Sequence, residues 1–133
     1  MFCGIVADDV PAFRVVDEPD GVAFLDTRPV FKGHVLVVPR PHVGQLTELP
    51  EDLLPGYFGL VRRIAAAVPG ALGAQGTFVA MNNVVSQSVP HLHTHVVPRT
   101  KGDGLRGFFW PRHKYASDEE ATGYAKRIAA ELG

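Results

Sequence analysis

The chain has 133 residues, of which 46% are hydrophobic and 20% charged, and its formal net charge is −1. This size and composition predict one compact soluble domain, and the charge excludes the broad basic surface of a protein that binds nucleic acid polymers. The sequence has a single cysteine, no signal-peptide pattern and no run near the roughly 18 apolar residues of a membrane span. We therefore expect a cytoplasmic protein without an internal disulfide and without a membrane partner.

The first half of the chain predicts three strands. Residues 13–17 and 22–25 form two short strand-like runs around the turn-rich sequence Glu18-Pro19-Asp20-Gly21, which is typical of a hairpin. Residues 34–38 form a β-branched run that is stopped by Pro39. A continuous apolar run of this length predicts a buried strand near the centre of the sheet.

The second half begins with the main helix. Apolar residues follow helical spacing over residues 54–68, with Pro55 expected in the first turn and Pro69-Gly70 expected to end the helix. Residues 77–81 then predict a strand, and residues 82–88 form a polar loop that leads to a run of histidines. Hairpin and helical connections between strands favour an antiparallel sheet over a parallel one.

The predicted fold class is therefore α+β, a single domain with an antiparallel five-stranded sheet, one main helix and a C-terminal helix. Ser117 and Glu120 form the pattern of a capping box for that last helix, which carries an apolar stripe. We expect residues 101–133, an aromatic loop around residues 108–110 followed by this helix, to pack on the domain formed by residues 1–100.

The sequence Pro90-His91-Leu92-His93-Thr94-His95-Val96-Val97 places histidines at alternate positions. In a strand, His91, His93 and His95 share one face, and the intervening residues take the other. A buried polar group without a hydrogen-bond partner costs roughly 1–3 kcal/mol of stability. Three imidazoles in a core strand would therefore destabilise the fold unless every ring nitrogen had a partner. The alternation therefore indicates a reaction centre.

Two kinds of chemistry use histidines at this spacing. A metal site is the first, but alternate strand residues lie roughly 6.6 Å apart, whereas each ligand of one zinc ion lies about 2.0 Å from the metal. A nucleophilic imidazole is the second, because neutral histidine can attack phosphorus near pH 7 and leave again. Gln87 and Ser88 lie just upstream, where their donors could hold phosphate oxygens.

The motif resembles the signature of the histidine triad family, with Thr94 as a polar exception among its hydrophobic positions. The resemblance extends to residues 24–29, to residues 33–39 with His42, and to Gln87-Ser88-Val89, and it covers residues 2–99. It implies a nucleotide hydrolase or nucleotidyl transferase that cleaves a bond at the α-phosphate through a covalent nucleotidyl-histidine. It also implies a homodimer that needs no cofactor and takes a small nucleotide, with a purine expected.

Residue by residue, the resemblance makes His93 the nucleophile. His91 would orient the His93 ring through its backbone carbonyl, and His95 would contact the phosphate and assist the leaving group. The implied substrate-binding residues are Asp26 and Thr27 at the nucleoside, Asn83 or its neighbour Asn82 near the ribose and phosphate, Gln87 and Ser88 at the phosphate, and His34 as a supporting histidine. Asp26 could instead cap a turn, and His34 could be a core histidine.

The chain departs from the family pattern at the phosphate loop. Ser86 stands where relatives often carry glycine, which removes easy access to positive φ, and Pro90 removes a backbone donor. A non-catalytic nucleotide-binding module and a metal-dependent protein therefore remain alternatives. The resemblance leaves phosphoramidates, dinucleoside polyphosphates, nucleotidyl sulfates and acyl adenylates open as substrates.

The N-terminus resembles half of a zinc motif found in some relatives. Cys3, His42 and His91 would supply three of the four ligands that a closed structural zinc site needs, so we expect no such site. Cys3 is then expected to be a small buried side chain.

Overall fold

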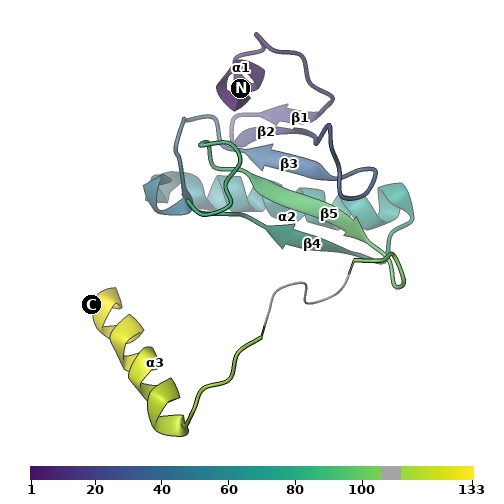
Figure 1. Ribbon diagram of the computed structural model, residues 1–133. Helices are drawn as coiled ribbons and strands as arrows, with labels where there is room; N and C mark the ends of the chain where they lie inside the picture. The colour runs from purple at the N-terminus through teal and green to yellow at the C-terminus, as the bar shows by residue number, and fades with distance from the viewer. Residues whose placement is uncertain (106–111) are drawn as a thin grey trace. The chain divides into compact units, whose positions relative to one another are not determined.

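The computed structural model describes residues 1–105 and 112–133 (Figure 1). They form two compact units, Met1–Asp103 and Gly104–Gly133, and each is described by itself. The aromatic cluster predicted at residues 108–110 lies outside the described residues. Among the residues that are described, no helix combines the length and the apolar character needed to cross a membrane.

The first unit contains the predicted five-stranded antiparallel sheet. Its strands are β1 (Arg14–Glu18), β2 (Gly21–Leu25), β3 (Val35–Val38), β4 (Gly76–Ala80) and β5 (Thr94–Arg99), in the spatial order β1-β2-β3-β5-β4. The β1–β2 hairpin turns where it was predicted, and β3 is the central strand. The α+β class is therefore confirmed, and β5 lies inside the sheet between β3 and β4.

Helix α2 (Leu54–Leu72) runs along one face of the sheet (Figure 1). Pro55 lies in its first turn, as predicted, after a short 3-10 turn at Glu51–Leu53. The predicted end at Pro69-Gly70 is wrong, because the helix continues to Leu72. It ends only at Gly73, whose φ of 70° is left-handed and whose N–H bonds to the Pro69 carbonyl.

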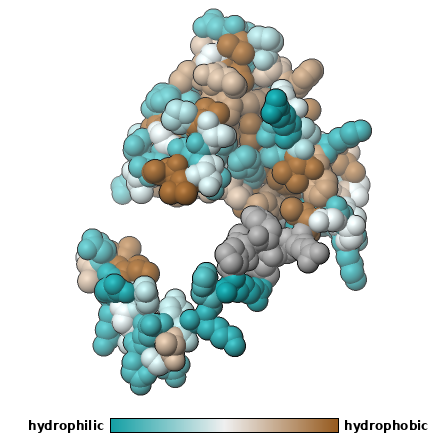
Figure 2. All heavy atoms as spheres, in the orientation of Figure 1, coloured by the Kyte–Doolittle hydropathy of each residue, from teal (hydrophilic) through white to brown (hydrophobic). Residues whose placement is uncertain are grey.

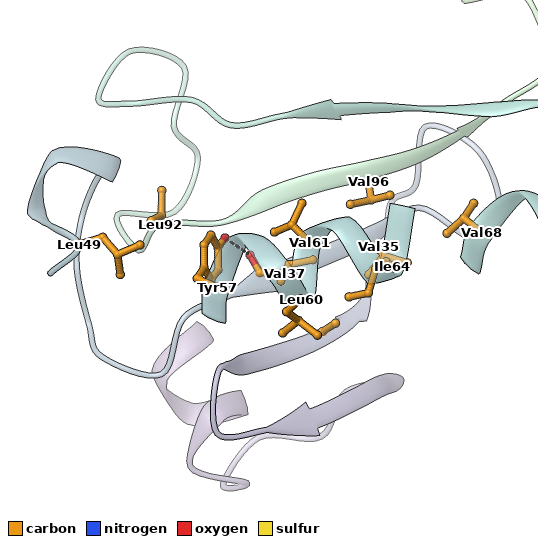
Figure 3. Packing of buried hydrophobic residues seen from close by; sticks show 11 residues of the cluster. Val35, Val37, Leu49, Tyr57, Leu60, Val61, Ile64, Val68, Leu92 and Val96 are labelled. Atoms are coloured by element: carbon orange, nitrogen blue, oxygen red, sulfur yellow. Dashed lines mark hydrogen bonds between the residues drawn. The ribbon is translucent and has the colours of Figure 1, made fainter. Parts of the chain in front are cut away.

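Alternate residues of the strands pack into two cores. On the α2 side, Leu60, Ile64 and Val96 belong to one buried cluster (Figure 3). This cluster also contains Tyr57, whose hydroxyl donates to the Val37 carbonyl (2.9 Å) and lies 2.6 Å from Thr94 Oγ1. Because the tyrosine proton goes to the carbonyl, the Thr94 hydroxyl donates to Tyr57.

The opposite face of the sheet is covered by a helix that the sequence did not predict. Helix α1 (Phe2–Val6) contributes Phe2 and Ile5 to the second core, where they pack with residues such as Phe24 and Leu36. The Arg14 guanidinium donates to the Ile5 carbonyl and so ties α1 to strand β1. Figure 2, in the orientation of Figure 1, shows hydrophobic and hydrophilic residues interspersed on the visible face of this unit.

The second unit contains helix α3 (Asp118–Leu132). Its N-cap Ser117 accepts from the Glu120 amide (3.1 Å), and the Glu120 carboxylate accepts from the amide of Ala116 (2.9 Å), one residue before the cap. No described side chain of α3 is buried, and Figure 2 shows hydrophobic residues near its C-terminal end. Packing of this helix on the domain stays a prediction.

Candidate functional site

The histidine motif straddles the start of β5. The strand begins at Thr94, so the expectation of one strand through all three histidines is wrong for His91 and His93. The His91 amide bonds to the Val89 carbonyl (2.8 Å) and closes a three-residue turn around Pro90, whose fixed φ suits such a turn. The alternation of faces nevertheless persists.

His93 is held by the backbone of His91. Its Nδ1 lies 2.8 Å from the His91 carbonyl oxygen, and the side chain is 3% exposed. A carbonyl can only accept, so the proton of the neutral ring sits on Nδ1 and Nε2 keeps its lone pair. The Phe2 ring packs edge-on against the His93 ring, with 5.1 Å between centroids.

His91 is a buried, neutral support. The ring is 1% exposed, and its Nε2 donates to the Pro39 carbonyl (3.2 Å). Burial lowers the pKa of His91, and the neighbouring His42 and His93 lower it further. The contact of the His91 carbonyl with His93 Nδ1 is the one that the family resemblance implied, and a role for His91 in the reaction stays a prediction.

His95 and His34 form a direct imidazole pair. His34 Nε2 lies 2.9 Å from His95 Nδ1, and the His95 ring lies 5.0 Å from the His93 ring, centroid to centroid. Burial, assisted by His93 and His34, lowers the pKa of His95 to about 4, and burial also lowers the pKa of His34. Both rings are therefore neutral near pH 7.

His93 and His95 line a cavity of about 480 Å³. His93, His95, Asp26, Thr27 and Ser88 supply its polar lining. The remaining wall is largely apolar and comes from Met1, Phe2, Ile5, Val10, Pro11, Ala12, Phe13, Phe24, Leu25, Leu36 and Val89. A cavity of this size, with a few polar groups in a largely apolar wall, is typical of small-molecule sites.

Asp26 caps a turn and also lines the cavity, and ribose binding by this residue stays a prediction. Its Oδ1 accepts from the Arg28 amide (2.9 Å), which is a turn cap, and its carboxylate also lines the cavity. Oδ2 lies 3.7 Å from His34 Nδ1. Oδ1 therefore fixes the local backbone, and Oδ2 lies beside the His34 ring.

Three predicted binding residues do not line the cavity: His34, which reaches it only through His95, and Gln87 and Asn83. The Gln87 amide donates to the Gly44 carbonyl, and Asn83 Oδ1 accepts from the Leu46 amide (2.8 Å). The structure thus brings Asp26, Thr27 and Ser88 together with the histidines, whereas Gln87 and Asn83 hold the loop to the segment after β3.

The loop before the histidines is strained. Val84 and Ser86 have φ angles of 72° and 61°, in the left-handed region. Contrary to the expectation from sequence, Ser86 adopts the conformation that glycine would allow. A left-handed L-residue costs roughly 1–2 kcal/mol, so each of these residues lowers the stability of the loop.

The sequence reasoning missed the part of the site that α1 builds. Phe2 lines the cavity and contacts the rings of both His91 and His93. Helix α1 has only five residues, too few to show a helical period. The available signal was the aromatic residue itself, beside a segment that already resembled the family.

Two groups of side chains in the described residues could hold a metal ion: Cys3, His42 and His91, and Asp26, His34 and His95. Cys3 Sγ lies 3.0 Å from His42 Nδ1 and 3.5 Å from His91 Nδ1. These are three ligands, one fewer than a closed structural zinc site uses. The expectation that Cys3 is buried is wrong, because the residue is exposed.

Comparison with known proteins shows the family of the chain. A sequence model of the HIT domain matches residues 7–102. The chain is 36% identical to "Protein hit" of Bacillus subtilis, over 98% of this chain and 94% of the relative. It is 30% identical to "Adenosine 5'-monophosphoramidase hnt1" of Schizosaccharomyces pombe, over 99% of this chain and 97% of that protein.

Solved structures agree. A HIT family protein from Bacillus subtilis superimposes with a TM-score of 0.90 at 36% identity, covering 100% of this chain and 96% of that one. A histidine triad family protein from Mycobacterium smegmatis, described as zinc-bound, gives a TM-score of 0.74 at 38% identity, covering 98% and 93%. On its fold, its histidine motif and these matches, the chain belongs to the HIT family, the histidine triad proteins.

Proposed function

We propose that this protein is a nucleotide hydrolase or nucleotidyl transferase that cleaves a bond at the α-phosphate through a covalent nucleotidyl-His93 intermediate. The observation that carries the proposal is the 2.8 Å contact from His93 Nδ1 to the His91 carbonyl, in a ring that lines a 480 Å³ cavity. Relatives named adenosine 5'-monophosphoramidase support an AMP-releasing reaction.

The chemistry follows from the tautomer of His93. Its Nε2 lone pair attacks the α-phosphorus, and the bond from phosphorus to the leaving nitrogen or oxygen breaks. Water then attacks the same phosphorus and releases the nucleotide from His93. For a phosphoramidate, the net reaction takes up one water and yields a nucleoside monophosphate and an amine.

The remaining cavity suits a nucleoside. Asp26 can accept hydrogen bonds from ribose hydroxyls, and Ser88 can donate to phosphate oxygens. The chamber lined by Phe2, Ile5 and Phe24 offers apolar contact to the base. The larger faces of a purine bury more of this surface than a pyrimidine does, which supports the purine preference.

A homodimer is part of the same proposal. Strand β4 lies at an edge of the sheet, and Val79 on β4 and Phe58 on α2 are 44% and 39% exposed. Apolar side chains near an open strand edge support association with a second copy. Light scattering coupled to size exclusion should give twice the mass of the 14.4 kDa chain.

The test is a turnover assay with two substrates, an adenosine phosphoramidate and a diadenosine polyphosphate, with and without EDTA. We expect metal-independent release of AMP and a protein–AMP adduct trapped by rapid denaturation at alkaline pH. Binding of AMP without release would support the binding module instead, and loss of turnover in EDTA would support a metal-dependent enzyme.

Variants locate the reaction. His93→Ala should abolish both turnover and the adduct while AMP still binds. His113→Ala is the matched control, because it also removes one imidazole, from the second unit and outside the histidine motif, and it should retain both. Unchanged turnover in His93→Ala would exclude His93 as the nucleophile.

A further inference from the structure

A chain of contacts links a backbone amide to the cavity through two imidazoles. The Val30 N–H points at His34 Nδ1 (3.1 Å), and His34 Nε2 lies 2.9 Å from His95 Nδ1. His34 is 3% exposed, so solvent does not compete for these contacts. The sheet holds the backbone of both residues, because His34 directly precedes the central strand β3 and His95 lies within β5.

The amide fixes the proton of the first ring. A backbone N–H can only donate, so His34 Nδ1 must accept and the single proton of the neutral ring sits on Nε2. Asp26 Oδ2 is the charged group nearest His34 Nδ1, but at 3.7 Å it lies beyond hydrogen-bond distance, and Asp26 Oδ1 already accepts from Arg28. The Val30 amide therefore decides the tautomer.

The second ring must follow the first. Because His34 Nε2 donates, His95 Nδ1 accepts, and the proton of neutral His95 sits on Nε2. His93 has the opposite arrangement, since its Nδ1 donates to the His91 carbonyl. Two rings that both line the cavity, with centroids 5.0 Å apart, thus offer a lone pair on one Nε2 and an N–H on the other.

We propose that His34 is a positioning residue that, oriented by the Val30 amide, holds His95 as the Nε2–H tautomer so that His95 donates a hydrogen bond to the leaving atom. This assignment rests on the proposed function, because the leaving atom belongs to its substrate. His34 therefore acts through His95 and does not itself bind substrate. The family resemblance placed it among the substrate-binding residues, as a supporting histidine.

The direct test is the ¹⁵N spectrum of the histidine side chains in the full-length protein, because protonated and unprotonated ring nitrogens have well-separated shifts. We expect Nδ1–H for His93 and Nε2–H for His34 and His95. Val30→Pro removes the donating N–H, and His34 and His95 should then populate their other tautomers. Val30→Ala keeps the N–H and should leave the spectrum unchanged.

A second pair of variants, His34→Gln and His34→Leu, tests the same role if Val30→Pro does not fold. Gln in His34→Gln can still donate an amide N–H toward His95 Nδ1, whereas His34→Leu has no donor. With a phosphoramidate whose leaving group is a basic amine, His34→Leu should lose about 10- to 100-fold in turnover, as removal of a positioned donor does, and His34→Gln should recover most of it. With a good leaving group such as nitrophenolate, the two variants should differ less than about threefold, because little assistance is needed.

The outcomes separate this inference from the proposed function. An Nδ1–H tautomer for His95 in the unaltered protein, or equal losses for both leaving groups in His34→Leu, would overturn the role of His34 while leaving a His93-dependent hydrolase intact. If the spectrum shows the expected tautomers but the protein turns over no nucleotide, the proposed function is overturned. The tautomers of His34 and His95 would then stand as assigned, and the role of His95 toward a leaving atom would fall with the proposed function.

Discussion

Removal of one hydroxyl behind the histidines should destabilise the protein far more than removal of its partner. Tyr57 OH donates to the Val37 carbonyl and accepts from Thr94, and both side chains are 1% exposed. In Tyr57→Phe the Thr94 hydroxyl loses its partner, which costs about 1–3 kcal/mol for a buried polar group. In Thr94→Val the tyrosine keeps the Val37 carbonyl, so only one net hydrogen bond of about 0.5–1.5 kcal/mol is lost, and the added methyl offsets part of it.

The double variant Tyr57→Phe/Thr94→Val distinguishes the cost of an unpaired buried hydroxyl from a loss of packing contacts. It leaves neither side chain with an unpaired hydroxyl, so it should be no less stable than Tyr57→Phe alone, with a coupling free energy of roughly 1–2 kcal/mol. Urea unfolding monitored by circular dichroism gives the four free energies of unfolding. Tyr115→Phe, which alters a tyrosine that is 61% exposed, should change stability by less than about 0.5 kcal/mol.

Additive effects in the double variant would refute the argument. Equal losses in the two single variants would do the same, because the asymmetry comes only from which hydroxyl retains a carbonyl. The m-value should stay constant across the set, since a change would mean that the denatured state had altered instead.

Three further results are expected. Ser86→Gly should raise the free energy of unfolding by up to about 1 kcal/mol, because relief of about 1–2 kcal/mol of strain at the φ of 61° outweighs the roughly 0.4–1 kcal/mol that glycine costs through the unfolded chain. Denaturant titration measures the difference, and a net loss of stability would mean that Ser86 is not strained. The pKa of His95 falls from 6.5 in the unfolded chain to about 4 in the folded one, so the unfolded state binds more protons and stability should decrease as pH drops through that window; His95→Asn should flatten the dependence measured by unfolding at each pH. Gly21→Ala should destabilise strongly, since its Cβ would lie 2.6 Å from the Val38 carbonyl oxygen, and a melting temperature equal to that of the unaltered protein would contradict the close approach of β2 and β3.

Local patterns predicted most of the fold because each strand and each of the two longer helices carried its own signal, whereas the five-residue α1 did not. The β-branched run before Pro39 identified β3, and the helical period over residues 54–68 identified α2. The end of α2 was missed because the residue that terminates it is Gly73, in a left-handed conformation, and not the proline four residues earlier.

The sequence identified candidate site residues where the type of side chain and its spacing point to a chemistry. It could not identify those whose contacts depend on the three-dimensional arrangement of the chain. The alternating histidines were named from the motif and Asp26 from the family resemblance, and all of them but His91 line the cavity. Gln87 and Asn83 could not be placed, because an amide binds a backbone group as readily as a phosphate, and only the fold shows which is near. The Val30 amide has no sequence signature at all, because every residue except proline carries the same donor.

Helix α1 and strand β5 differ in how freely they can open. Strand β5 is paired on both edges, whereas α1 is a five-residue terminal helix held by Arg14 and a few apolar contacts. Local opening should therefore cost little at α1 and approach the full unfolding free energy at β5, a contrast that amide hydrogen exchange would resolve. Opening of α1 would expose the wall of the cavity that Phe2 and Ile5 form and would remove the contact of Phe2 with the His93 ring, whereas His95 would keep its place in β5.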